Sequence, residues 1–284
     1  MSGIYWLASY LKSGNTWFRA FLQNLLEDGD RPVDINKLTT FRVASDRGWF
    51  DDVLGFDSAN LDADELERLR PEVYRWSLRD EYIGYHKIHD AYTYTQGGEP
   101  LVSREATLGA LYILRNPLDV ALSYANHNHS SINDAIAHMG DGEHALCRFP
   151  KGLPNQARQK LLSWSGHVLS WVDATALNCQ VLRYEDMQAD PVAAFTGAAR
   201  FLNLSDDPVR IEKAIRFSDF QELARQEAEN GFYERPPRIE RFFREGKSGD
   251  WREKLTPAQV ERIVADHGVV MRRFGYLDAD GRPL

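Results

Sequence analysis

Residues 4–26 read IYWLASYLKSGNTWFRAFLQNLL, an apolar run followed by a short polar turn and a second apolar pattern. Positions 4–10 are apolar and rich in aromatic side chains, which is typical of a buried strand. After the turn KSGNT at 12–16, apolar side chains recur at 17, 18, 21, 22, 25 and 26, the spacing of one helix face. The stretch therefore predicts a strand, a tight turn and a helix.

The rest of the chain repeats this alternation. Three more segments have the composition of strands, at 82–88, 108–114 and 180–183. Helical patterns occupy 62–69 and 161–172, and Asn116 followed by Pro117 has the form of a helix N-cap and first helical residue. Strands separated by helices predict an α/β fold with a central, mostly parallel sheet flanked by helices.

Two regions lack a regular pattern. Residues 28–80 are acidic and broken, and residues 226–250 carry glycines, a Pro-Pro pair and many charges, which predicts a long functional loop. No repeat, low-complexity tract or linker is recognisable. We therefore expect residues 1–284 to form a single domain.

Composition narrows the class of protein. The chain has 284 residues, 43% of them apolar, which suffices for a large α/β domain with a substantial core. A formal net charge of −8 argues against a nucleic-acid partner but is compatible with a local basic pocket for a small anion. Two cysteines make no disulfide framework, and neither a signal peptide nor a membrane-spanning run is recognisable. We expect a cytoplasmic protein without a nucleic-acid or membrane partner.

The turn at 12–16 has the features of a phosphate site. The first backbone N–H groups of a helix have no intrahelical partner, and the helix dipole favours an anion there. Lys12 adds a cation, and Ser13, Asn15 and Thr16 add short polar side chains. The alternative is a surface turn in which Thr16 merely caps the helix. The turn also lacks the Gly-Lys-Ser/Thr of a Walker loop.

Two further polar segments stand where ligands gather in α/β proteins. RNPLD at 115–119 ends a predicted strand, and Ser123 returns to the same helix face two turns later. An arginine and a hydroxyl can hold a phosphate together, although a structural Arg115–Asp119 ion pair is an equal alternative. FREGKSGDW at 243–251 combines Arg244 with glycines that permit close backbone approach, or is simply a flexible charged loop.

Together and in this order, the three segments resemble the sulfotransferases that use 3′-phosphoadenosine-5′-phosphosulfate (PAPS). That family has Lys-Ser-Gly-x-Thr-Trp, Arg-Asn-Pro-x-Asp-x-x-x-Ser and Arg-x-Gly-x-x-Gly-Asp-Trp. The resemblance covers residues 4 to about 262 and implies a P-loop-like nucleotide-binding fold. It also implies no catalytic metal.

The resemblance also implies roles for individual residues. It assigns the 5′-phosphosulfate to Lys12, Ser13, Gly14, Asn15 and Thr16, and the 3′-phosphate to Arg115, Ser123, Arg244 and Gly246. It places Trp17 and Phe220 on the two faces of adenine and Tyr184 beside the nucleotide. For Trp17, Phe220 and Tyr184 the alternative is core packing, the commoner fate of aromatic residues.

KIH at 87–89 resembles the family's Lys-x-His at a strand end, which implies catalytic roles for Lys87 and His89. An imidazole suits removal of a proton from an acceptor hydroxyl or amine. His86 is the nearby competitor, and its offset of three residues predicts that it points to the other face of the strand. The histidines at 127, 129, 138 and 144 match no metal-site spacing and are predicted to lie in a solvated loop.

The chain departs from the family pattern in three places. Glu245 stands where many members have a basic residue, which weakens attraction for the 3′-phosphate unless Lys247 compensates. Asn15 replaces a common threonine. Residues 252–261 differ from the dimer motif of animal cytosolic members, so that dimer is not predicted and the oligomeric state stays open.

We therefore predict transfer of a sulfuryl group from PAPS to a small-molecule acceptor, with release of the product PAP. The main alternative is a P-loop kinase that uses ATP and Mg²⁺. It accounts for the strand–turn–helix but not for the Arg115–Ser123 and Arg244–Gly249 segments. A second alternative is a non-catalytic nucleotide-binding module, against which His89 and Lys12 argue.

Overall fold

The computed structural model describes residues 2–78, 83–148 and 154–284 and divides into two compact units. The first unit comprises Met1–Tyr10, Thr40–Tyr112 and Asp141–Val181, and the second comprises Leu11–Thr39, Ile113–Gly140 and Leu182–Leu284. Each unit is assembled from three separate stretches of chain, so the division does not fall at a linker. A single domain over residues 1–284 stays a prediction.

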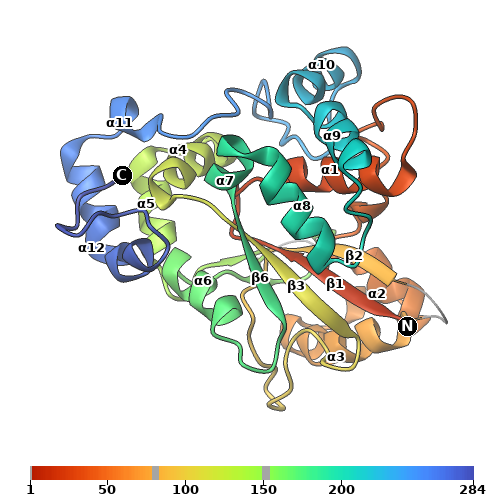
Figure 1. Cartoon of the computed structure of the whole chain (residues 1–284). Coiled ribbons are helices and arrows are strands. Elements are labelled where there is room, and N and C mark those ends of the chain that lie inside the picture. The colour runs from red at the N-terminus through yellow and green to blue at the C-terminus, as the bar shows by residue number, and fades with distance from the viewer. Residues whose placement is uncertain (1, 79–82, 149–153) are drawn as a thin grey trace. The chain divides into compact units, whose positions relative to one another are not determined.

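A four-stranded sheet with the order β2-β1-β3-β6 forms the centre of the fold (Figure 1). Its strands are β1 (Gly3–Ala8), β2 (Ile83–Ile88), β3 (Thr107–Leu114) and β6 (Cys179–Arg183). β1 pairs in parallel with β2 on one side and β3 on the other. All six residues of β1 are buried, as the continuous apolar run predicts for a central parallel strand.

One face of the sheet packs against helices of the first unit. Trp6 contacts Tyr74 of α3 at 4.8 Å between ring centroids, and the His86 ring is tilted against Trp49 of α2 with centroids 4.4 Å apart. Trp6 and His86 are partners in the register of β1 and β2 and so project to the same side. The first unit contains α2 (Arg47–Leu54), α3 (Ala63–Trp76), α6 (Trp164–Val172), and the short strands β4 (Ala145–Leu146) and β5 (Gln159–Lys160).

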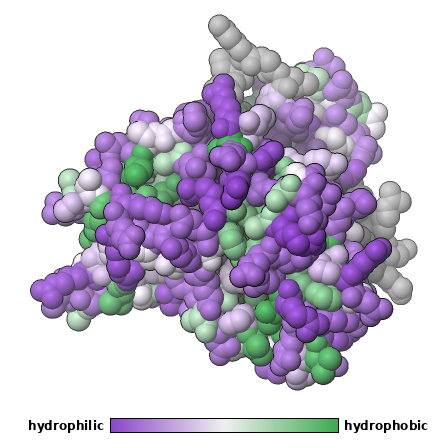
Figure 2. All heavy atoms as spheres, turned by 90° about the horizontal axis from the view of Figure 1, so that it is seen from above, coloured by the Kyte–Doolittle hydropathy of each residue, from purple (hydrophilic) through white to green (hydrophobic). Residues whose placement is uncertain are grey.

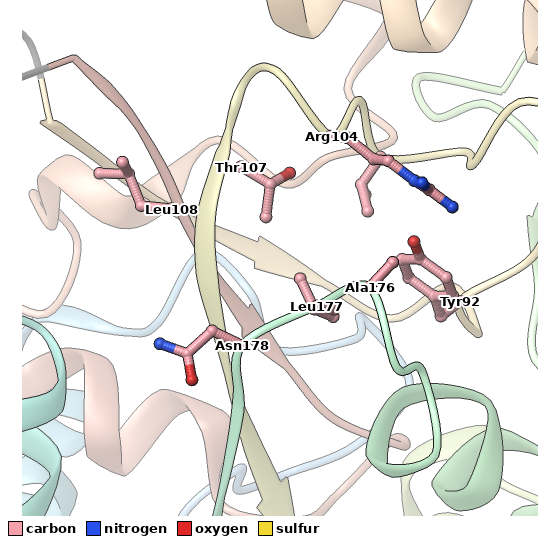
Figure 3. A pocket seen from close by; sticks show the side chains of 8 residues that line it. Tyr92, Arg104, Thr107, Leu108, Ala176, Leu177 and Asn178 are labelled. Atoms are coloured by element: carbon pink, nitrogen blue, oxygen red, sulfur yellow. The ribbon is translucent and has the colours of Figure 1, made fainter.

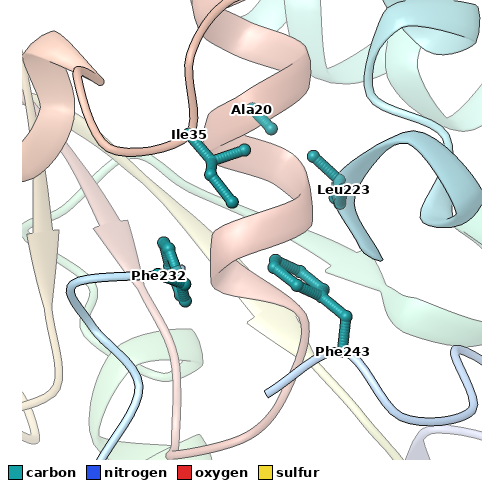
Figure 4. Close-up of a cluster of buried hydrophobic side chains, with 5 residues drawn as sticks. All are labelled: Ala20, Ile35, Leu223, Phe232 and Phe243. Atoms are coloured by element: carbon teal, nitrogen blue, oxygen red, sulfur yellow. The ribbon is translucent and has the colours of Figure 1, made fainter. Parts of the chain in front are cut away.

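The second unit is mostly helical. Its helices are α1 (Asn15–Glu27), α4 (Pro117–Asn128), α5 (Ile132–Gly140), α7 (Tyr184–Ala189), α8 (Pro191–Phe201), α9 (Pro208–Phe217), α10 (Phe220–Asn230), α11 (Trp251–Lys254) and α12 (Pro257–Arg273). Figure 4 shows one of its buried clusters, in which α1 and α10 meet residues of the loop that follows α10. The cluster consists of Ala20, Ile35, Leu223, Phe232 and Phe243.

The structure confirms the predicted α/β class and adjusts several boundaries. Helix α6 begins at Trp164, not at 161, because Ser163 accepts a hydrogen bond from Gly166 N and caps it. Helix α3 runs to Trp76, beyond the predicted 69. The predicted strand 82–88 is observed from Ile83, while Tyr82 lies outside the described residues.

The region 226–250 is not a loop throughout, because α10 continues to Asn230 and ends at Gly231, whose φ is 74°. The remainder is irregular but anchored. Buried Glu227 accepts hydrogen bonds from Phe242 N and Phe243 N at 2.7 and 2.9 Å. Arg19 of α1 is fully buried and pairs with Glu234 at 2.7 Å. Contacts of the chain itself therefore fix the course of this segment.

The face shown in Figure 2 is mostly hydrophilic, with hydrophobic side chains in small separate groups. None of the helices within the described ranges is long and apolar enough to cross a bilayer.

Candidate active site

The turn that joins β1 to α1 leaves the N-terminus of a 13-residue helix open. Gly14 precedes the helix with φ 101° and ψ 8°, a left-handed conformation that favours glycine. The Tyr184 ring lies against it, so that a Cβ at position 14 would meet Tyr184 Cδ2 at 2.6 Å. No described side chain caps α1, so the alternative that Thr16 merely caps this helix is wrong. The open end favours an anion.

Three buried polar atoms near this turn lack a hydrogen-bond partner within the described part of the chain. They are Ser13 Oγ, Trp17 Nε1 and Arg115 Nε. Buried polar groups in folded proteins are nearly always paired, and all three of these can donate a hydrogen bond. Such a set of donors fits an anionic nucleotide such as PAPS or PAP.

The Lys12 side chain lies in the same unit, between an imidazole and an aromatic ring. Its Nζ is 3.5 Å from His127 Nδ1 of α4 and 3.8 Å from the centroid of Phe242. His127 was predicted to lie in a solvated loop, and that prediction is wrong. His138 was placed in the same loop but belongs to α5, where it packs near Tyr124 at 6.3 Å. His127 follows Ser123 by four residues, so a helical reading of this stretch would have found it.

Arg115, which belongs to the segment 115–119, forms hydrogen bonds to both the turn at 12–16 and the loop at 243–251. Its guanidinium donates to Lys12 O at 3.2 Å and to Lys247 O at 3.0 Å, and it lies 4.2 Å from the centre of the Tyr184 ring. Asp119 does not pair with Arg115; its carboxylate accepts from Gly249 N at 2.8 Å and from the Trp251 amide. The proposed alternative of a structural Arg115–Asp119 ion pair is therefore wrong. The structure brings the three segments together within the second unit.

The 243–251 loop is fixed around Gly246. Gly246 has φ 62°, and a Cβ there would lie 2.2 Å from a ring carbon of Phe220. Gln188 of α7 donates to Gly246 O and accepts from Ser248 Oγ at 2.6 Å. Gln188 was not predicted, because no sequence pattern links α7 to a loop 58 residues away. Arg244, on the same loop, is exposed.

The charges beside this loop neutralise one another. Lys247 lies 3.5 Å from Glu245 and 3.4 Å from Asp250, and Lys254 pairs with both carboxylates at 2.9 Å. The two lysines offset the two acidic groups, so Glu245 leaves the surroundings of Arg244 without excess negative charge.

The aromatic residues predicted around the nucleotide also pack on their own unit. Trp17 meets Tyr184 and Phe195 edge to face, at 5.6 and 5.5 Å between centroids. Phe220 meets Phe243 in the same manner at 6.3 Å. Trp17 and Phe220 are only half-buried, so each keeps a surface for another ring. Ser123 is half-buried on α4.

His89 belongs to the first unit and follows the last residue of β2. Its Nδ1 lies 2.9 Å from the backbone oxygen of Ser9 and 3.4 Å from Ser9 Oγ. A carbonyl oxygen can only accept a hydrogen bond, so Nδ1 carries the proton and Nε2 is the unprotonated nitrogen. The imidazole is half-buried. His89 thus has the tautomer of a base that would act through Nε2.

His86 has the environment of a core residue. It lies between Trp6 and Trp49, and burial lowers its pKa to about 4. Lys87 is half-buried on β2 in register with Leu7. The described residues contain no group of three side chains suited to bind a metal ion.

A separate small cavity in the first unit lies where strands β3 and β6 begin (Figure 3). Thr107 at the start of β3 and Asn178 before β6 line it, together with Tyr92 and Arg104. Its volume of about 40 Å³ holds a few water molecules but no nucleotide. Ligands of open α/β sheets bind at the carboxyl ends of the strands, so this cavity is not the active site.

Comparison with known proteins gives a consistent family. Residues 104–275 match the family model described as "Sulfotransferase domain". The chain is 27% identical over 275 residues to flavonol 3-sulfotransferase of Flaveria bidentis, covering 90% of this chain and 78% of that protein. It is 30% identical over 179 residues to cytosolic sulfotransferase 16 of Arabidopsis thaliana, covering 58% and 50%.

Solved structures show the same fold. Retinol dehydratase in a complex with retinol and PAP has a TM-score of 0.63 at 17% identity, covering 96% of this chain and 82% of that one. A mouse sulfotransferase complexed with PAP has a TM-score of 0.58 at 21% identity, covering 98% and 86%. The likeness confirms the predicted P-loop-like α/β fold.

Proposed function

The chain belongs to the sulfotransferase family, and from that membership we infer that it transfers the sulfuryl group of PAPS to a small acceptor and releases PAP. The kinase alternative is not favoured, since the chain matches the sulfotransferase model over residues 104–275 and lacks a Walker loop. The observation that carries the proposed nucleotide site is the set of unpaired buried donors, Ser13 Oγ, Trp17 Nε1 and Arg115 Nε.

We propose that the second unit holds the nucleotide. The open N-terminus of α1, with Ser13, Gly14, Asn15 and Thr16, would receive the 5′-phosphosulfate. The 3′-phosphate would be bound by Arg115, Ser123, Arg244 and Gly246. Trp17 and Phe220 would hold the adenine ring, with Tyr184 beside it.

His89 is the proposed base. The acceptor oxygen or nitrogen forms a bond to sulfur, the bond from sulfur to the phosphate oxygen breaks, and the acceptor proton passes to His89 Nε2. Lys12 stabilises the charge that develops on the departing phosphate oxygen, where help is differential for the transition state. Lys87, which lies on β2 two residues before His89, is proposed to take part in catalysis with it.

The acceptor is proposed to be a small molecule with a hydroxyl or amine. A curated relative is named for a flavonol, and solved neighbours were crystallised with retinol and androsterone. A cytoplasmic location is proposed on the same basis, because one relative is named as cytosolic.

Calorimetry and turnover together test this function. PAP should bind tightly without Mg²⁺ and ATP weakly, and labelled PAPS should transfer its sulfuryl group to at least one member of an acceptor library. Tight Mg²⁺-dependent ATP binding would support the kinase. Tight PAP binding without turnover on any acceptor would support a binding module.

His89→Asn tests the base assignment. Transfer should be abolished while PAP affinity stays near that of the wild type, because His89 is proposed to touch the acceptor and not the nucleotide. His86→Ala, the control, should reduce stability more than rate. An active His89→Asn together with a folded but inactive His86→Ala would reverse the assignment.

A further inference from the structure

A buried pair of side chains lies directly behind His89 in the first unit. His167 of α6 is fully buried; its Nε2 is 3.0 Å from His89 O and its Nδ1 is 2.8 Å from the Tyr112 hydroxyl. Tyr112, on β3, is also fully buried and receives a backbone hydrogen bond from Tyr10. The pair therefore links the chain after β1, at Tyr10, with the chain after β2, at His89.

The protonation of this pair follows from its partners. The carbonyl oxygen of His89 only accepts, so His167 Nε2 carries the proton and Nδ1 accepts from the Tyr112 hydroxyl. Burial lowers the pKa of His167 to about 4 and raises that of Tyr112 well above its usual value. Both groups are consequently neutral throughout the working range of an imidazole base. His167 contacts the backbone oxygen of His89, so we expect its effect on catalysis to come through the position of His89.

Helix α6 also forms hydrogen bonds to the backbone of residues 90 and 92, which follow His89. Trp171 Nε1 donates to Asp90 O at 3.0 Å, and Ser170 Oγ accepts from Tyr92 N at 3.0 Å. His167, Ser170 and Trp171 have the i, i+3, i+4 spacing of one helix face. One rigid face thus contacts three of the four residues 89–92.

His89 itself is held at both ends. His167 fixes its carbonyl group, and the Ser9 carbonyl fixes its ring through Nδ1. Together they restrict the backbone and the side-chain rotamer, and so the direction of Nε2. Stability alone does not require a polar pair at this place, because replacing two buried bonding partners by apolar groups of similar shape is often nearly neutral for stability.

We propose that His167, oriented by Tyr112, is a positioning residue for the catalytic base. The inference rests on the proposed role of His89. It assigns to α6 the function of aiming Nε2 at the acceptor, without contact between His167 and any substrate. Misplacement of a reacting group by about 1 Å can cost on the order of 10²-fold in rate.

The test compares two tyrosines of the same unit. Tyr112→Phe removes the hydroxyl that orients His167. Tyr74→Phe removes an equally buried hydroxyl that accepts from Arg70 Nε at 2.9 Å and donates to Ala44 O at 2.7 Å. We expect Tyr112→Phe to lower kcat about tenfold with unchanged PAP affinity, and Tyr74→Phe to leave kcat unchanged even if it unfolds more readily. Equal kcat values for the two variants at equal folded fraction would overturn the proposal.

Substitutions of His167 give a second, independent readout. His167→Leu should lower kcat about 10- to 100-fold, and His167→Gln should recover most of that loss because an amide can donate to His89 O and accept from Tyr112. If His167→Gln is as slow as His167→Leu while equally folded, positioning by this hydrogen bond is wrong.

His89→Asn, measured alongside, separates the two levels of the argument. Full activity of His89→Asn would remove the proposed base and this inference with it. Loss of activity in His89→Asn, with wild-type kcat in both Tyr112→Phe and His167→Leu, would leave the base in place and reject only its positioning by α6.

Discussion

The turn at 12–16 in the second unit differs from residues 89–92 of the first unit, here called the His89 segment. The two regions differ in whether their buried polar groups have hydrogen-bond partners. Around the turn, Ser13 Oγ and Trp17 Nε1 are buried without a partner in the described chain. Behind His89, both nitrogens of His167 are bonded and the Trp171 indole donates to Asp90 O. A buried donor without a partner costs free energy and can bond to a ligand, whereas a network in which every group is hydrogen-bonded fixes the geometry. The first region should therefore respond to substitution in ligand affinity, and the second in stability and rate.

The largest effect is expected at a buried ion pair of the His89 segment. Arg70 and Asp90 are each 1% exposed and joined at 2.8 Å. Asp90→Asn should lower the free energy of unfolding by about 3–5 kcal/mol, because it leaves a buried guanidinium without its counter-charge. Urea denaturation measures this. Asp52→Asn, which breaks the exposed Arg42–Asp52 pair, is the matched control and should cost less than about 1 kcal/mol. Similar losses in both would contradict the argument from burial.

Lys12→Ala should act on rate and not on folding. Removing one group that stabilises transition-state charge typically lowers kcat about 10²- to 10³-fold. The free energy of unfolding should change less than the rate, because a contact such as that of Lys12 with Phe242 contributes about 0.5–1 kcal/mol. Lys213→Ala, which removes a lysine paired with Asp28, is the control and should retain wild-type turnover. Wild-type kcat in Lys12→Ala would remove Lys12 from the mechanism.

Acid should weaken the first unit through its buried histidines. Burial lowers the pKa of His86 and His167 to about 4, whereas an unfolded histidine titrates near 6.5. Between these values the unfolded chain binds more protons, so stability is complete above pH 6.5 and is lost as pH falls towards 4. Each histidine should contribute a loss of about 2 kcal/mol between pH 7 and pH 5. Urea unfolding of His86→Leu at the two values should show a smaller loss than the wild type; an equal loss would mean that His86 is charged in the fold.

The local elements of both regions are predictable from sequence, because each depends on neighbouring residues. The apolar run at 4–10 gave a strand to Ala8, and Asn116 with Pro117 opens α4 as expected. The start of α6 was missed because Leu162 takes a left-handed conformation and Ser163 caps the helix, which the apolar pattern does not reveal.

Contacts between distant segments were not predictable. His167 meets His89 across 78 positions, and His127 meets Lys12 across 115. Hydrophobic periodicity gives the face of an element but not the partner of that face. The family resemblance named the residues proposed to touch the nucleotide and the acceptor. It did not identify His127, which contacts Lys12, or His167, which contacts the backbone of His89.

A smaller effect is expected at the loop that would bind the 3′-phosphate. Arg244→Ala should weaken PAP binding about tenfold, the value of one charge-assisted hydrogen bond, and leave adenosine-5′-phosphosulfate unaffected because that ligand lacks the phosphate. Arg115→Ala should weaken both ligands, since Arg115 also holds the Lys12 carbonyl. Calorimetry with the two ligands decides. Equal losses for both ligands in Arg244→Ala would make that arginine structural.

The smallest effect is the most direct test of the comparison, because its sign differs between ligand-free and bound protein. Ser13 is 1% exposed and its hydroxyl has no partner among the described residues. Ser13→Ala removes a desolvated group that forms no bond, so the ligand-free protein should keep or gain up to about 1 kcal/mol of stability. PAP affinity should nevertheless fall several-fold, because the hydroxyl would bond the 5′-phosphate.

Ser163→Ala provides the opposite case for Ser13→Ala. Ser163 Oγ caps α6 through Gly166 N at 3.1 Å, so its loss should cost about 1 kcal/mol without any change in PAP affinity. Thermal unfolding of both variants with and without PAP measures the four quantities. If Ser13→Ala destabilises the ligand-free protein as much as Ser163→Ala does, its hydroxyl is already satisfied without nucleotide. The turn would then be as saturated as the His89 segment, and the contrast between the two regions would not hold.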